Sequence, residues 1–298
     1  MCESQKDALR PFLRRPTPLT TASGSIEADF SLCNGQTHLS RLFCTAPLKI
    51  AKTFPLAGAG LSVIVMDASP GLLAGDHYRM AWRLESGARV EIETQGFTRV
   101  HPSRERPCTL ETHLEVATGA HLEWHPQPTV LYRDADLRAE TVAHLEEGAT
   151  LLASEIWCAG RVERGEAFAF ASFCNRWRVY RNGAPIFASS LDLQPELPDP
   201  RAASAFGDWT HAGNFWVWHE NANAKLLDAL WEVLKDDTSL SRSVYAGASG
   251  LAGGGVMVSL LGRRAHDLQE MIALLRVTAR RHLWRAKHSK EDNESQPF

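Results

Sequence analysis

Three carboxylates occupy positions where a charged side chain needs a partner, and they are the first candidates for chemistry in this sequence. Asp76 closes a glycine-containing turn, Glu155 interrupts an otherwise apolar segment, and Glu166 follows an Arg-Gly pair. A buried charge is costly unless it is paired or bound to a cation. These side chains are therefore either satisfied by backbone N–H groups and by arginines such as Arg161 or Arg164, or available as transient ligands of a divalent metal.

A second candidate set alternates along one predicted strand. His121, Glu123 and His125 are two residues apart, so their side chains share one face of that strand. Imidazole and carboxylate groups in this arrangement could hold a borderline divalent metal ion. An exposed strand face with ordinary polar residues would show the same pattern, so both interpretations stay open.

The sequence lacks the motifs of several common catalytic and nucleotide-binding sites. The chain has no G-x-S-x-G elbow, no H-E-x-x-H pair and no G-x-x-x-x-G-K-[ST] loop. The glycine-rich run at 247–255 precedes a predicted strand and not a helix, which argues against a dinucleotide site. Six scattered cysteines without a C-x-x-C pair are typical of reduced thiols in a cytoplasmic protein and do not suggest a zinc site.

Net charge and hydropathy limit the kinds of partner that this chain can bind. The net charge of −3 provides no field to attract nucleic acid. The N-terminus is charged and lacks an apolar leader, and no apolar run reaches the roughly 20 residues of a membrane span. Basic residues gather between Arg276 and Lys290, a pattern typical of a solvated helix face or of a surface for an acidic partner.

The elements that must position these residues begin with a repeated turn. Ser86, Thr118 and Glu147 each precede a Gly-Ala pair and a run of strand-forming residues, at spacings of 32 and then 29 residues. This recurrence predicts repeated β-strands and not a βαβ unit. The strands are predicted to start near Ala88, Ala120 and Ala149. An Asn182-Gly183 pair between two further strands predicts a tight hairpin.

Helical periodicity is confined to the C-terminal third, near residues 223–235 and 267–285. The sequence therefore predicts a mainly β molecule of stacked, twisted multi-strand sheets, with solenoid-like or sandwich character and two principal C-terminal helices. We expect an extended segment at 1–23, one domain at 24–285 and a polar tail at 286–298.

Five segments, in their order and spacing, resemble the UreD (UreH) family of urease accessory proteins over residues 24–283. They are RLFCTAPLK at 41–49, SPGLLAGD at 69–76, TQGFTRV at 94–100, WHPQPT at 124–129 and GRVERGEAF at 160–168. The second and the fifth of these segments contain Asp76 and Glu166.

The resemblance implies a largely β, non-catalytic cytoplasmic scaffold. Such a protein would dock on apo-urease and act with UreF-like and UreG-like partners to deliver nickel to urease. It also implies no tightly bound cofactor and at most weak, transient Ni²⁺ contacts, with Asp76, Glu155 and Glu166 as the residues to test. The C-terminal helices and tail are expected to support binding of the UreF-like partner.

Two alternatives of other classes remain at the level of sequence. One is a β-rich glycoside hydrolase that uses a carboxylate pair such as Asp76 and Glu166. The other is a general protein-binding module.

Overall fold

The computed structural model describes residues 23–294, apart from 197–198, 203–204 and 237. The extended segment expected at 1–23 therefore lies outside the described residues, except for Ser23.

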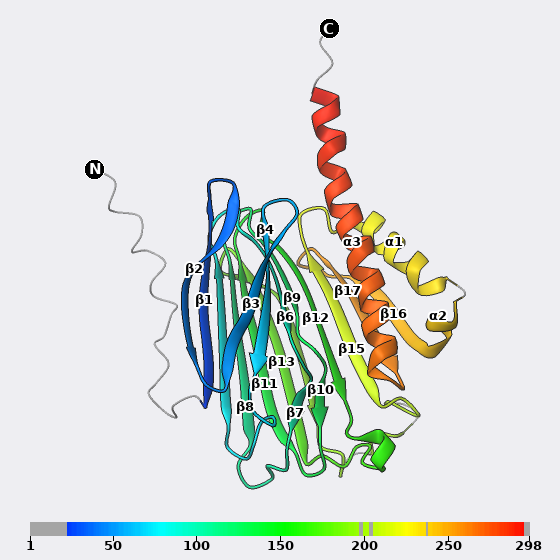
Figure 1. Ribbon diagram of the computed structural model, residues 1–298. Helices are drawn as coiled ribbons and strands as arrows, with labels where there is room; N and C mark the ends of the chain where they lie inside the picture. Colours follow the sequence, from blue (N-terminus) through cyan, green and yellow to red (C-terminus); the bar gives the residue numbers. More distant parts are fainter. Residues whose placement is uncertain (1–22, 197–198, 203–204, 237, 295–298) are drawn as a thin grey trace.

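Two large β-sheets pack face to face (Figure 1). Sheet A has the order β14 (Ala184–Leu193), β13 (Ser172–Arg181), β11 (Asp136–Leu145), β8 (Cys108–Val116), β5 (His77–Leu84), β1 (Gly24–Cys33) and β2 (Gln36–Thr45). Sheet B has the order β16 (Val244–Gly250), β17 (Val256–Gly262), β15 (His211–Trp218), β12 (Thr150–Cys158), β9 (His121–His125), β6 (Arg89–Thr94), β4 (Gly60–Asp67) and β3 (Leu48–Leu56). Two short strands, β7 (Thr98–Val100) and β10 (Thr129–Leu131), pair with each other, and β10 also pairs with β12.

The repeated Gly-Ala turns make this sandwich a solenoid. From β4 to β13 the chain alternates between the sheets, so each circuit adds a parallel strand to both. The three turns lead from β5 to β6, from β8 to β9 and from β11 to β12. They stack on one another through backbone hydrogen bonds, such as the 2.8 Å bond from His121 N–H to the Ala88 carbonyl. Gly119 has φ 66°, a conformation that glycine adopts without strain. The predicted starts of β6, β9 and β12 are confirmed to within one residue.

The predicted hairpin is also confirmed. Asn182 and Gly183 join β13 to β14 with φ values of 49° and 80°. Positive φ at both central residues gives a turn whose twist matches that of the flanking strands.

One apolar core lies between the two sheets, and a second lies between sheet B and the helices. Strand β12 contributes to both, because Leu151 and Trp157 point into the sandwich while Leu152 and Ile156 point toward the helices. A strand that is covered on both faces has apolar residues at nearly every position, which explains the run of apolar residues from Leu151 onward.

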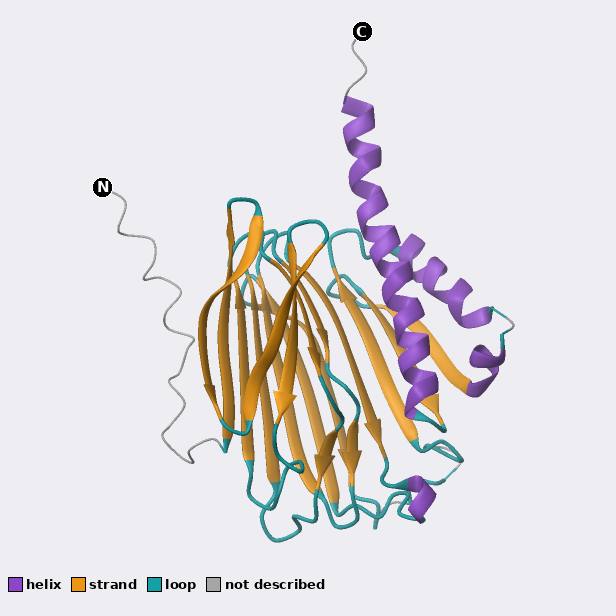
Figure 2. Cartoon of the chain, viewed as in Figure 1, coloured by secondary structure: helices purple, strands orange, loops and turns teal. Residues whose placement is uncertain are grey.

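In the part of the chain that the structure describes, three α-helices lie on the outer face of sheet B at one side of the molecule (Figure 2). They are α1 (Ala224–Lys235), α2 (Ser239–Ser243) and α3 (Ala265–Glu294). The Asn223 side chain caps α1 by accepting hydrogen bonds from the backbone of Lys225 and Leu226. Both predicted helices are confirmed, but α3 continues to Glu294, so most of the tail expected at 286–298 is helical and only 295–298 lie outside the described residues.

Within the described ranges, no helix combines the length and the apolar character that crossing a membrane requires.

Candidate functional site

The five segments that carry the family resemblance meet at one end of the sandwich, the lower end in Figure 1, where β4, β9 and β12 finish. Backbone N–H groups join neighbouring segments there: Ala68 donates to the Pro47 carbonyl (3.0 Å), Leu72 to the Arg99 carbonyl (2.8 Å), and Gln127 to the Thr94 hydroxyl (2.8 Å). These bonds link the segments between residues 41 and 129, and the segment at 160–168 follows β12 at the same end. This end of the sandwich, with its five segments, is called here the motif end.

A cavity of about 80 Å³ lies between the two sheets. Aromatic and aliphatic side chains form much of its wall. Its polar lining consists of hydroxyl, amide and carboxylate groups from Thr94, Thr98, Thr112, Thr129, Thr141, Glu155 and Asn175. Three of these threonines lie in segments of the motif end, so the cavity connects that end with Glu155.

Glu155 points into the sandwich and is held by three donors. Asn175 Nδ2 and Trp177 Nε1 donate to one carboxylate oxygen at 2.9 and 2.7 Å, and Asn214 Nδ2 donates to the other at 3.0 Å. Burial raises the pKa of Glu155, although the three hydrogen bonds favour the charged form. Asn214 in turn accepts a 3.0 Å hydrogen bond from the exposed Ser259, so a hydrogen-bonded chain links the carboxylate to the surface.

Glu166 forms a bidentate ion pair at the motif end. Arg161 donates from Nε and Nη2 to its two oxygens at 2.7 and 2.6 Å. These charge-assisted hydrogen bonds lower the pKa of Glu166. The guanidinium also lies 4.3 Å from the centre of the Tyr132 ring. Gly160, with φ 130°, allows this arrangement, because a Cβ there would lie 2.2 Å from the Glu166 carbonyl oxygen.

Asp76 stabilises its own turn. Its Oδ2 accepts the Leu73 N–H at 2.8 Å, and its N–H donates to the Leu73 carbonyl at 2.9 Å. This is the local bonding expected of an aspartate in a turn. Across the described part of the chain, no hydrogen bond or ion pair connects Asp76, Glu155 and Glu166 with one another.

Each of the three predicted carboxylates therefore has protein partners, and the backbone and arginine partners that the sequence suggested are present for Asp76 and Glu166. The partners of Glu155 were missed. Asn175 and Trp177 occupy inward positions of β13 between Phe173 and Val179. A single amide in an otherwise apolar alternation was the available signal, but only the fold places it opposite β12.

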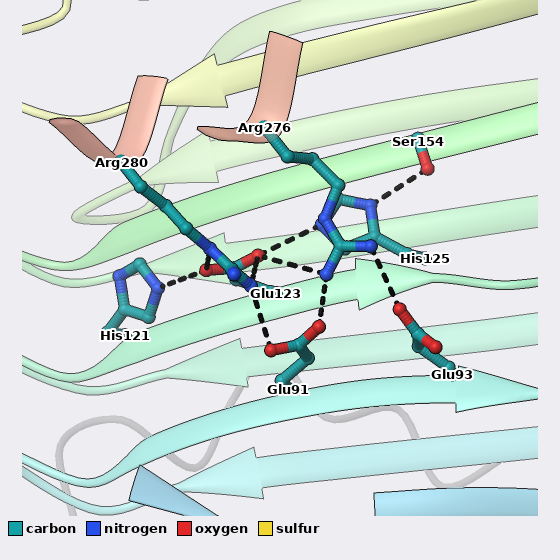
Figure 3. Close-up of polar contacts among 8 residues, drawn as sticks. All are labelled: Glu91, Glu93, His121, Glu123, His125, Ser154, Arg276 and Arg280. Atoms are coloured by element: carbon teal, nitrogen blue, oxygen red, sulfur yellow. Dashed lines mark hydrogen bonds and ion pairs between the residues drawn. The ribbon is translucent and has the colours of Figure 1, made fainter. Parts of the chain in front are cut away.

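His121, Glu123 and His125 share the outer face of sheet B, as their spacing predicts (Figure 3). The Nε2 atoms of both histidines lie 3.2 Å from the Glu123 oxygens. Arg280 of α3 donates to the same carboxylate from Nε at 2.7 Å and from Nη2 at 2.6 Å. Glu123 is only 3% exposed. This face is covered by α3 and is not the exposed strand face that the sequence allowed.

Two more glutamates on β6 complete the charged layer. Arg276 pairs with Glu91 and, at 2.8 Å, with Glu93, while Arg280 reaches Glu91 at 2.8 Å. The expectation of a solvated basic segment is therefore wrong for Arg276 and Arg280, which face the sheet. Their guanidiniums supply the positive charge that a metal ion would otherwise provide to Glu123.

Burial and ion pairing shift the pKa of Glu123 in opposite directions in this charged layer. Burial by itself would raise the pKa of Glu123, but hydrogen bonds from His121, His125 and Arg280 outweigh it and hold that pKa well below its ordinary value. Burial lowers the pKa of His125 to about 4, so its ring is neutral at pH 7 and shares a 2.8 Å hydrogen bond with Ser154. No group of three or more His, Cys, Asp or Glu side chains arranged to hold a metal was found among the described residues.

Comparison with known proteins agrees with the segments at the motif end. The family model described as UreD urease accessory protein matches residues 22–292. The urease accessory protein UreD of Acetivibrio thermocellus is 31% identical over 244 residues, which cover 82% of this chain and 92% of the relative. UreD of Haloarcula marismortui is 31% identical over 251 residues, covering 83% of this chain and 82% of the relative. UreD of Actinobacillus pleuropneumoniae serotype 3 is 30% identical over 241 residues, covering 80% and 89%. The chain belongs to the UreD family of urease accessory proteins.

Proposed function

We propose that this protein is a non-catalytic, cytoplasmic scaffold that docks on apo-urease and, with UreF-like and UreG-like partners, supports insertion of nickel into the urease active site. Membership of the UreD family over nearly the whole chain carries this proposal. The meeting of the five family-matched segments at the motif end adds a physical reason, since one contiguous surface is what a docking protein needs.

Nickel would be cargo in this function and not a resident cofactor. Ni²⁺ accepts oxygen and imidazole ligands, and a site that passes the ion on must bind it weakly. The polar lining of the cavity and the Glu155 carboxylate supply oxygen ligands between the sheets. Asp76 and Glu166 place two further carboxylates at the motif end. We propose these three residues as transient contacts along the route, without a tight preformed site.

The C-terminal helices are the proposed contact for the UreF-like partner. The inner face of α3 is held to sheet B by Arg276 and Arg280, which keeps the helix fixed in place. Its outer face exposes Leu274 (49%) and Val277 (42%), one helical turn apart. An apolar stripe on a rigid helix fits a protein partner. The basic side chains that face the sheet do not contribute to this surface.

A glycosidase receives less support from the same geometry. A general acid in such an enzyme needs a raised pKa. The bidentate pair with Arg161 lowers the pKa of Glu166, and Asp76 is engaged by the backbone of its turn.

Reconstituted activation tests the proposal. Apo-urease, the UreF-like and UreG-like proteins, GTP and limiting nickel are mixed with and without this chain, and urease activity is followed. We expect activity to rise well above the level of the mixture that lacks the chain. Equal activity in the two mixtures would contradict the proposed function.

A further inference from the structure

A second, open pocket of about 390 Å³ lies at the motif end, where four parts of the chain meet. The segment after β12 forms one wall with the 3-10 helix η2 (Val162–Arg164). Tyr132 after β10, the start of β15 and the turn between β17 and α3 form the others. The lining is dominated by four guanidinium groups, from Arg161, Arg164, Arg263 and Arg264.

Two of these arginines are neutralised and two are not. Arg161 is paired with Glu166, and Arg263 lies 3.4 Å from the exposed Asp208. The side chains of Arg164 and Arg264 are exposed and make no hydrogen bond or ion pair with any part of the chain that the structure describes. Arg164 and Arg264 thus bring to the pocket two positive charges that have no ion-pair partner within the described ranges.

The other titratable groups in the lining do not cancel this charge. Among the described residues, Glu163 is the one carboxylate that lines the pocket. Burial lowers the pKa of His211 to about 4, so its ring is neutral at pH 7 and adds no charge. Nearby Asp267, in the first turn of α3, acts on His211 but does not line the pocket. With Arg161 and Arg263 paired, Arg164 and Arg264 face one glutamate, which leaves a net positive charge in the lining.

A stack of aromatic rings continues the surface beside the pocket. The Arg263 guanidinium lies 5.1 Å from the centre of the Trp209 ring. Trp209 in turn stacks on Tyr245 of β16, with ring centres 6.5 Å apart and planes inclined by 19°. Tyr245 is 67% exposed. Tyr, Trp and Arg are the residue types that contribute most to the binding energy of protein interfaces.

We infer that this pocket and the adjoining Trp209–Tyr245 stack bind an acidic segment of a protein partner. Arginine recognises carboxylates through paired N–H donors, so Arg164 and Arg264 can each receive one carboxylate of that segment. The pocket is open, and a small anion bound there would stay largely solvated. A protein segment can cover the pocket and the aromatic rings together.

This inference rests on the proposed function, because it names the chemistry by which one of the urease-maturation partners docks. The test measures the affinity of the full chain for apo-urease, for the UreF-like protein and for the UreG-like protein separately. It compares wild type with the double variant Arg164→Glu/Arg264→Glu. Arg138→Glu is the matched control, since Arg138 is exposed, has no hydrogen bond or ion pair within the described ranges and lies on sheet A away from the pocket.

We expect the double variant to bind one of the three proteins at least about tenfold more weakly, while Arg138→Glu binds it as wild type does. Glu163→Gln should strengthen the same interaction, and Tyr245→Ala should weaken it. Added salt should reduce the wild-type affinity more steeply than that of the double variant. Circular dichroism melting confirms that the variants fold.

The outcomes separate the two proposals. If wild type binds none of the three proteins, the proposed function fails. If wild type binds but the double variant binds all three equally well, or if Arg138→Glu weakens binding as much, the acidic-segment site is wrong and the scaffold function stands.

Discussion

Glu123 is the central carboxylate between sheet B and α3. Its side chain is almost fully buried and is paired with Arg280 and with both neighbouring histidines. Removing one partner from such a pair leaves the other charges buried without a counter-charge. The resulting loss of folding free energy is larger than the net stabilisation that the intact pair provides. The side chains of Arg276 and Arg280 are 15% and 31% exposed, so water relieves part of that cost.

Glu123→Gln is therefore expected to lower the free energy of unfolding by about 2–4 kcal/mol, measured by urea denaturation at pH 7. The control is Glu111→Gln, whose side chain is 42% exposed and whose ion-pair contacts within the described residues are those to His77 and His113, both at 4.0 Å. That change should stay within about 0.5 kcal/mol of wild type. A Glu123→Gln protein as stable as the control would show that the charged layer does not hold α3.

His125 makes stability depend on pH. Its pKa is about 4 in the folded protein, because of burial, against an ordinary value near 6.5 in the unfolded chain. Between these values the unfolded state binds more protons, so stability rises with pH. The contribution of the neutral His125 ring to the free energy of unfolding is fully present above pH 6.5. It falls as the pH drops toward 4, by at most about 3 kcal/mol.

Urea unfolding of wild type and of His125→Gln at pH 7, 6 and 5 tests this dependence. The variant should be less stable at pH 7 but lose less stability on acidification. His211 shifts in the same direction, so some slope remains in the variant. Parallel pH profiles for the two proteins would contradict the assignment of the effect to His125.

Glu155 differs from the other two candidate carboxylates because it lies in the cavity and its pKa is raised. If nickel passes this way, loss of the carboxylate removes a ligand. We expect Glu155→Gln to reduce urease activation several-fold at limiting nickel and less at excess nickel. Asp76→Ala and Glu166→Ala are compared in the same assay, with Glu111→Gln as the control. Full activation by all three folded variants would leave only structural roles for these residues.

Helix α3 is anchored by packing as well as by charge. Leu275 is completely buried against sheet B, whereas the adjacent Leu274 is 49% exposed. Leu275→Ala should lower the free energy of unfolding by about 2–5 kcal/mol, because it opens a cavity in the second core. Leu274→Ala should cost less than about 1 kcal/mol. Urea denaturation of the two neighbours gives a direct comparison, and equal losses would mean that the helix does not pack as described.

At the scale of elements, the predictable features are those encoded by local sequence. The Gly-Ala turns, the Asn182-Gly183 hairpin and the two helical periodicities each depend on a few neighbouring residues, and all are confirmed. The pairing of Arg276 with Glu91 joins residues 185 positions apart and has no local signal. The same holds for the donors of Glu155, which come from β13 and β15 and meet only after both sheets have formed.

At the scale of the whole molecule, the solenoid explains how separated segments become one surface. Each circuit returns the chain to the same end of the sandwich, so segments from successive circuits stack there. The candidate route and the arginine-lined pocket both lie at or near this end. The regular turns at the opposite end carry none of the family-matched segments. The fold thus separates the end with the regular Gly-Ala turns from the end that carries the family-matched segments.

The nickel content of urease after maturation tests the central claim most directly. Apo-urease is incubated with its accessory proteins, GTP and limiting nickel, with or without this chain, then re-isolated and analysed for metal per active site. We expect nickel in the active sites to increase when the chain is present. Glu155→Gln should give an intermediate value. An unchanged nickel content with and without the folded chain would contradict a role in nickel insertion.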